Sequence, residues 1–367
     1  MAIWVLGLAI AALALAGHGL RGGKIGSIWA AIAALSIGFV VGAAAIRVGM
    51  SWGKIERDTE FAGIARVAAD IIDENTGDYA LFVGASYSRN GLDDERLTAR
   101  LRTNGLNWRA VNLSLQGASW QEREYWLFAL LEAVERPPVA VFLEPSEEFD
   151  ADPLYVFRVA KFSDRAIAQF SPEATPAILA GVKESPPDGA RRLAEVAALT
   201  PMHFLLNWVN AGALAKGVFL RDAKPASGFL AEHTPREDLS ADFISENLRS
   251  NADAPQEGRF GQAARARIAE KLHQRGINEI WLYKPPVLEA NGRAYVAAIC
   301  AKSAFPCIAP TDPDLLQQLE GPFWFDRAHL LADGASIYAD WLAQEIIARR
   351  KDEGPAATAQ TEEARAR

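Results

Sequence analysis

An aspartate and a histidine stand three residues apart near the C-terminal end of this sequence, at Asp326 and His329 in FDRAHL. A D-x-x-H spacing on one turn brings both side chains to the same side, so the carboxylate can orient one ring nitrogen of the imidazole. The other ring nitrogen can then take a proton from a serine hydroxyl, which is a poor nucleophile without a base. Taken alone, the pair also fits a helix-entry turn in solvent.

A serine that such a base would activate lies far upstream, at Ser86 in VGASYSRNGLDD. Gly84 and Ala85 permit a tight turn out of an apolar strand, and Ser86 stands at its tip, where the next helix would start. A serine there faces backbone N–H groups that can stabilise an oxyanion. The alternative is a serine that only caps the helix. Ser88 is a second hydroxyl nearby, which we rank lower because it does not follow the Gly-Ala turn directly.

A glycine at a second strand end completes the set. In the segment NLSLQGAS, Gly117 is expected to end a strand, where a glycine lets the backbone approach a ligand closely. Because ligands bind at the carboxyl ends of the strands in open parallel sheets, Ser86 and Gly117 are expected at the same edge.

The elements that must position these residues follow an α/β rhythm. Short apolar runs alternate with helical patterns, which predicts a parallel sheet flanked by helices. The expected strands lie within 79–86, 108–119, 138–149, 277–287 and 305–312, and the expected helices within 93–105, 121–135, 260–276, 291–303 and 333–350. Asp333 is the predicted N-cap of the last helix.

The order of these motifs resembles the SGNH/GDSL hydrolase-like superfamily over residues 78–148 and 258–350. GASYSRNGLD is also similar to the first block of membrane-anchored bacterial members, which include relatives of the alginate-type O-acetyltransferases and of the D-alanyl transfer protein of lipoteichoic acid synthesis. The resemblance implies a flavodoxin-like SGNH fold with Ser86 as nucleophile, His329 as base and Asp326 as the acid that orients it. The N–H groups of Ser86 and Gly117 would bind the oxyanion.

Two positions depart from the family pattern. Ala85 stands where the first block usually has an aspartate, and the third block usually supplies an asparagine that donates to the oxyanion. Here that strand ends in FLEPSEE, and Glu144 cannot donate when ionised. Ser146 or a backbone N–H would have to substitute, since losing one oxyanion donor costs about 10²–10³ in rate.

The N-terminal segment predicts a membrane anchor over residues 1–50. Ala2–Gly17 and Ile28–Ile46 carry no charge, and the second run spans about 29 Å as a helix, close to the hydrocarbon thickness of a bilayer. Arg21 and Lys24 in the loop between them favour a cytoplasmic loop, which leaves the main domain outside. A signal peptide, a single anchor and a buried hairpin are the alternatives.

The remaining segments complete the predicted organisation. Residues 51–77 read as a linker helix, 78–350 as the α/β domain with a helical insertion at about 150–258, and 351–367 as a disordered tail. Cys300 and Cys307 are expected as unpaired, partly buried thiols. A disulfide is the alternative in an extracytoplasmic domain.

These features lead to two functional expectations. The first is a Ser-His-Asp acyltransferase or esterase, anchored in the bacterial inner membrane, that faces the periplasm and acts on a cell-envelope or exported polysaccharide. The second is a catalytically weak or inactive scaffold of a polysaccharide synthesis or modification complex. Expected partners are the bilayer, a glycan, and a membrane-bound acyltransferase or polysaccharide synthase, with no cofactor and no metal. A net charge of -8 without a basic block argues against nucleic-acid binding.

Overall fold

The computed structural model describes residues 60–151 and 228–352, together with positions 34, 37, 38, 41 and 42. The chain divides into two compact units, and the one described below spans Ile64–Pro153, Glu184–Pro187 and Pro225–Arg367. Apart from those five positions, which fall in the second predicted membrane helix, the predicted membrane helices lie outside the described residues, as do most of the predicted insertion and nearly all of the predicted tail. Among the residues that are described, no helix is both long enough and apolar enough to cross a bilayer.

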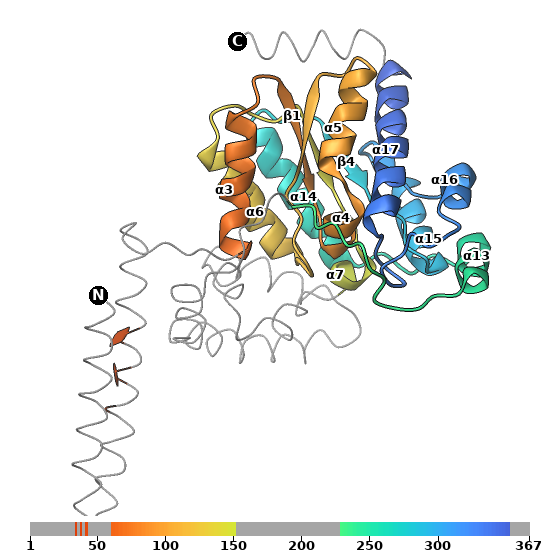
Figure 1. Cartoon of the computed structure of the whole chain (residues 1–367). Helices are drawn as coiled ribbons and strands as arrows, with labels where there is room; N and C mark the ends of the chain where they lie inside the picture. The colour runs from red at the N-terminus through yellow and green to blue at the C-terminus, as the bar shows by residue number, and fades with distance from the viewer. Residues whose placement is uncertain (1–33, 35–36, 39–40, 43–59, 152–227, 353–367) are drawn as a thin grey trace, which may run out of the picture. The chain divides into compact units, whose positions relative to one another are not determined.

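A five-stranded parallel sheet lies at the centre of this unit, in the order β2-β1-β3-β4-β5 (Figure 1). The strands are nearly all buried, as expected for a sheet with helices on both faces. The predicted α/β class is therefore confirmed. The strand bounds are β1 Asp78–Val83, β2 Trp108–Asn112, β3 Ala140–Leu143, β4 Ile280–Tyr283 and β5 Cys307–Ile308.

The helices pack against both faces of this sheet. The chain moves one way from β1 to β2 and the other way through β3, β4 and β5, so right-handed crossovers put α5 on one face and α6 and α14 on the other (Figure 1). The last helix, α17, packs against α5. The helix bounds are α3 Glu60–Asp73, α4 Ser86–Gly91, α5 Asp94–Thr103, α6 Trp120–Ala133, α7 Glu147–Ala151, α13 Ala241–Arg249, α14 Arg259–Gln274, α15 Ala290–Cys300, α16 Pro313–Gln318 and α17 Ala332–Asp352.

The last helix begins at Ala332, before the residue that the sequence predicted as its N-cap, Asp333. Ala335 N–H donates to the carbonyl of Leu331, so Asp333 lies inside the first turn of α17 and is not its N-cap. The prediction was wrong because other parts of the chain satisfy this helix end. Ala332 N–H, for example, donates to the carbonyl of Glu232 at 2.8 Å.

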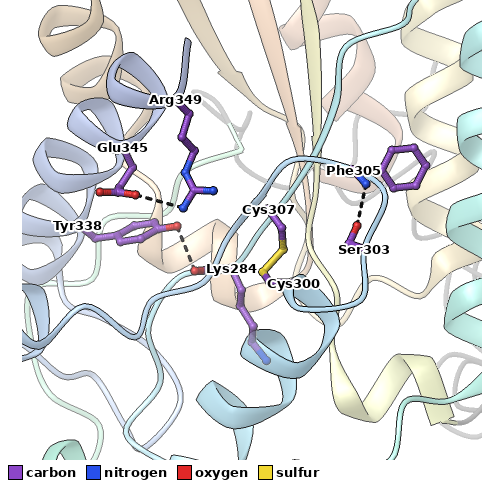
Figure 2. Close-up of a disulfide and its surroundings, with 8 residues drawn as sticks. All are labelled: Lys284, Cys300, Ser303, Phe305, Cys307, Tyr338, Glu345 and Arg349. Carbon is purple, nitrogen blue, oxygen red and sulfur yellow. Dashed lines mark hydrogen bonds and ion pairs between the residues drawn. A yellow bond between two sulfur atoms is a disulfide. The ribbon is translucent and has the colours of Figure 1, made fainter. Parts of the chain in front are cut away.

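The two cysteines form a disulfide, so the expectation of unpaired thiols was wrong. Cys300 is the last residue of α15 and Cys307 the first of β5, and the short connection between them brings their Cα atoms to 5.2 Å. That separation is within the usual range for a disulfide. Figure 2 shows the disulfide with Lys284 and Tyr338, whose hydroxyl donates to the Lys284 carbonyl at 3.0 Å.

Candidate functional site

Most of the predicted site residues follow the carboxyl ends of neighbouring strands. Ser86 follows β1, Gly117 follows β2, and Glu144 and Ser146 follow β3. In a parallel sheet these ends share one edge, and the first and third of these strands pair directly with one another. The topology therefore collects at one edge the residues that the sequence singled out separately.

Asp326 and His329 form the contact that their spacing predicted. Asp326 Oδ1 accepts hydrogen bonds from His329 Nδ1 at 2.8 Å and from the backbone N–H groups of Ala328 and His329 at 2.8 and 2.9 Å. Burial raises the pKa of Asp326, but these hydrogen bonds lower it more, so the net pKa lies below its ordinary value. The carboxylate is therefore ionised at neutral pH and fixes the imidazole from one side.

The other ring nitrogen of His329 is uncommitted. Nε2 is buried and has no hydrogen-bond partner in the part of the chain that the structure describes. The His329 ring stacks on the ring of Tyr87, with centroids 5.5 Å apart and planes inclined by 18°. Because Tyr87 directly follows Ser86, this ring pair puts the turn that holds His329 (the histidine turn) in contact with the turn that holds Ser86 (the serine turn).

Ser86 is the first residue of α4, and Ala85 occupies the N-cap position. The interpretation of Ser86 as a helix cap is therefore wrong. The Ser86 side chain is half-buried and makes no hydrogen bond with another described residue, His329 included. The structure thus brings the two turns together without joining the serine to the histidine.

A buried carboxylate lies beneath the serine turn. Glu144 Oε2 accepts the backbone N–H groups of Ala85 at 3.2 Å and Ser88 at 2.9 Å, together with the Ser88 hydroxyl. The Tyr283 hydroxyl donates to Ser88 Oγ at 2.7 Å. Ser88 is fully buried in this network, which removes it as a nucleophile for an external substrate.

The glycine before the serine is required by the same carboxylate. A Cβ at Gly84 would lie 2.5 Å from Glu144 Oε2 and 2.5 Å from Ser88 Oγ, closer than real Cβ contacts. Only a residue without a side chain leaves room here for the carboxylate and the hydroxyl. Gly84 therefore serves the packing beneath the turn as well as the turn itself.

Arg123 neutralises Glu144 from α6. Its Nη2 lies 3.5 Å from Glu144 Oε1, and both side chains are fully buried. Arg123 also donates to the Glu144 carbonyl and, at 2.9 Å, to the carbonyl of Ala118, while its guanidinium lies 4.7 Å from the centroid of the Trp120 ring. Burial lowers the pKa of Arg123 and the Glu144 carboxylate opposes that shift. As in other buried ion pairs, removing one partner alone would leave an unpaired buried charge and lower the stability of the fold.

A third strand end also holds α4. The Asn112 amide at the end of β2 donates to the carbonyls of Ser88 at 3.0 Å and Leu92 at 3.1 Å. The sequence motifs did not point to Asn112, Arg123 or Tyr283 as parts of the site. Polar residues inside otherwise apolar strand and helix patterns were the available signal, because a buried polar group needs a partner.

The two predicted oxyanion donors after β2 and β3 differ in their surroundings. Gly117 has φ +61° in the turn between β2 and α6, a conformation that favours glycine. Ser146 is fully buried just before α7, and its hydroxyl has no hydrogen-bond partner within the described ranges. In those ranges no group of three His, Cys, Asp or Glu side chains is suited to hold a metal ion.

Comparison with known proteins adds no family to this geometry. No protein-family model matches the sequence, and no curated protein is significantly similar to it. The resemblance to the SGNH/GDSL superfamily rests on the motif residues alone, from the Gly-Ala-Ser turn at 84–86 to the D-x-x-H turn at 326–329.

Proposed function

We propose that this protein is a Ser-His-Asp acyltransferase or esterase with a flavodoxin-like SGNH fold. The observation that carries the proposal is the state of His329: Asp326 holds its Nδ1, its Nε2 is buried without a partner, and its ring packs on the neighbour of Ser86. The sheet order 2-1-3-4-5 supports the fold, since it is the order of flavodoxin-like sheets.

In the proposed reaction Ser86 Oγ attacks the carbonyl carbon of an acyl ester while His329 Nε2 takes its proton. The backbone N–H groups of Ser86 and Gly117 stabilise the oxyanion, with Ser146 as the candidate third donor. The imidazolium then protonates the leaving alcohol, which departs and leaves the acyl group on Ser86. An acceptor hydroxyl gives its proton to His329 and attacks the acyl-enzyme, which releases the product and restores the Ser86 hydroxyl. A sugar acceptor makes the reaction a transfer, and water makes it hydrolysis.

We further propose that the protein is anchored in the bacterial inner membrane, with this domain on the periplasmic side. The two uncharged N-terminal runs support the anchor. The Cys300–Cys307 disulfide supports an oxidising compartment, where such bonds persist. A site held at the outer bilayer surface suits a cell-envelope or exported polysaccharide as substrate, with a membrane-bound acyltransferase or polysaccharide synthase as the partner protein.

The test of the chemistry is covalent labelling by a fluorophosphonate, which reacts with an activated serine. We expect labelling of the wild-type chain and none of Ser86→Ala, while Ser250→Ala, which alters an exposed serine elsewhere, reacts like wild type. Hydrolysis of an acetyl ester by Ser86→Ala should fall by at least about 10³-fold. Labelling or hydrolysis that survives in Ser86→Ala would refute the proposed mechanism.

A second candidate function is a scaffold or glycan-binding subunit of a membrane complex. It is favoured by the missing hydrogen bond between Ser86 and His329 and by the carboxylate of Glu144 at the position of the usual oxyanion donor. A scaffold would show no fluorophosphonate labelling of the wild-type chain in membranes, while the folded domain still bound polysaccharide or a partner enzyme.

A further inference from the structure

We infer that Glu144 is a positioning residue for the proposed reaction: it caps the helix that begins at Ser86 from a neighbouring strand and so holds the nucleophile's turn. This inference rests on the proposed function of Ser86. It assigns a role to the position where the family resemblance led us to expect an oxyanion donor.

The capping geometry is direct. In α4 the N-cap is Ala85, whose side chain has no acceptor, and the third helical residue is Ser88. An N-cap aspartate or serine normally accepts the N–H of that third residue. Here Glu144 Oε2 accepts it at 2.9 Å, from a residue 56 positions further along the chain. The strand end of β3 thus supplies the acceptor that position 85 lacks.

Because Glu144 caps the helix, the Ser86 hydroxyl is not needed as a hydrogen-bond acceptor for the helix N–H groups. A serine at the N-cap would commit its oxygen to the helix N–H groups, whereas Ser86 lies one position inside the helix. The carboxylate also favours the positive end of the helix. The two departures from the family pattern are then linked. Ala85 lacks the carboxylate that the family usually has at this position, and Glu144 supplies a carboxylate to the same turn from β3.

Arg123 balances the negative charge of the buried Glu144 carboxylate beneath the serine turn. An unpaired negative charge beneath the turn would oppose the negative charge that develops on the substrate oxygen in the proposed reaction. The fully buried guanidinium of Arg123, 3.5 Å from Glu144 Oε1, offsets that charge. Asn112 and Tyr283 hold the same helix from β2 and β4, so the turn is fixed before any substrate binds.

The test compares Glu144→Ala with a matched control, Asp150→Asn. Asp150 is also a fully buried carboxylate paired with a buried arginine, Arg265, but it contacts Trp120 and Tyr295 instead of α4. Both variants are measured at a temperature where circular dichroism shows them folded. We expect the maximal rate of fluorophosphonate labelling of Ser86 to fall about 10-fold or more in Glu144→Ala, while the probe concentration that gives half of this rate stays unchanged. In Asp150→Asn the maximal labelling rate should stay near that of the wild type.

A rescue variant separates positioning from general damage. Ala85→Asp added to Glu144→Ala places a carboxylate at the N-cap, next to the volume that the truncation vacates, and should restore part of the lost rate. Equal labelling rates in Glu144→Ala and Asp150→Asn would overturn the inference, whether or not the rescue succeeds.

Amide hydrogen exchange keeps the two proposals distinguishable. The peptide that contains the Ser88 amide should exchange about 10-fold faster in Glu144→Ala than in wild type, and Asp150→Asn should not change it. If the wild-type chain is not labelled at all, the proposed chemistry fails, and unchanged exchange at Ser88 would separately refute the capping role. Labelling that depends on Ser86 but not on Glu144 would refute the inference alone.

Discussion

The serine turn and the histidine turn of the candidate site are held in different ways. The serine turn lies on fully buried groups that come from three strand ends and one helix, with Glu144 at their centre. In the histidine turn, Asp326 accepts hydrogen bonds from Ala328 and His329, two and three residues further along, and the His329 and Asp326 side chains are 20% and 11% exposed. The serine turn is therefore fixed by buried groups of the core, whereas the imidazole of His329 makes its hydrogen bond within its own turn and packs on Tyr87.

This difference separates stability from chemistry. Removing a buried group under the serine turn should disturb the fold, since breaking one side of a buried ion pair typically costs about 3–5 kcal/mol. Removing the imidazole should disturb the reaction far more than the fold. The two turns therefore make opposite predictions for the same pair of measurements.

The largest effect is expected from His329→Ala. Loss of the base should lower acetyl-ester hydrolysis by about 10⁴-fold or more. The free energy of unfolding should fall by less than about 3 kcal/mol, because one hydrogen bond and the ring stack on Tyr87 are lost but no buried ion pair is broken. Urea denaturation and initial rates on the same samples measure both quantities. A loss of stability as large as that of Glu144→Ala would break the contrast between the two turns.

The disulfide gives a reference that belongs to neither turn. Cys300 and Cys307 close a loop with a sequence separation of 7, for which loop-closure entropy predicts about 2–3 kcal/mol of stabilisation. The double variant Cys300→Ser/Cys307→Ser should lose that amount in urea denaturation and keep its rate of Ser86 labelling. A parallel loss of labelling would show that the loop between α15 and β5 supports the site.

The smallest effect concerns the anchoring of α17, the helix that follows His329. Burial raises the pKa of Asp340, but hydrogen bonds from Arg96 and Arg100 on α5 lower it more, to about 2. A lowered pKa means that the contribution is complete above the ordinary value of 3.8 and is lost as the pH falls through about 2. The Arg96 and Arg100 side chains are 42% and 48% exposed, so solvent screening reduces the contribution of Asp340 to about 1 kcal/mol.

Asp340→Asn should therefore destabilise the fold by about 1 kcal/mol at pH 7, with a difference from wild type that shrinks towards zero near pH 2. Denaturation curves across this range, at low and high salt, measure it. A difference independent of pH and salt would mean that packing, not charge, joins α17 to α5. Labelling of Ser86 should be unchanged, because the hydrogen bonds of Asp340 go to α5 and not to either turn of the candidate site.

Patterns among neighbouring residues predicted much of the fold and part of the candidate site. Short apolar runs predicted β1 and β2, and a spacing that fits one turn predicted the Asp326–His329 contact. The expected strand end at Gly117 was wrong, because β2 ends at Asn112 and Gly117 lies in the turn that follows. The start of α17 was missed because its backbone donors find partners at Glu232 and Phe323, which no local pattern reveals. Signals confined to a few neighbouring residues were read well, and those that needed a distant partner were not.

The sequence by itself determined the α/β class, the order of the elements and the place of the D-x-x-H turn, because periodicity and short spacing depend only on neighbouring residues. Tertiary structure alone decided what Glu144 does. Its partners Ser88 and Arg123 lie on other elements, and Tyr283 reaches Ser88 across 195 positions of the chain. Contacts between strand ends are set by how the sheet assembles. Glu144, which stands where the family resemblance predicted an oxyanion donor, therefore accepts the Ser88 N–H and caps the helix that begins at Ser86.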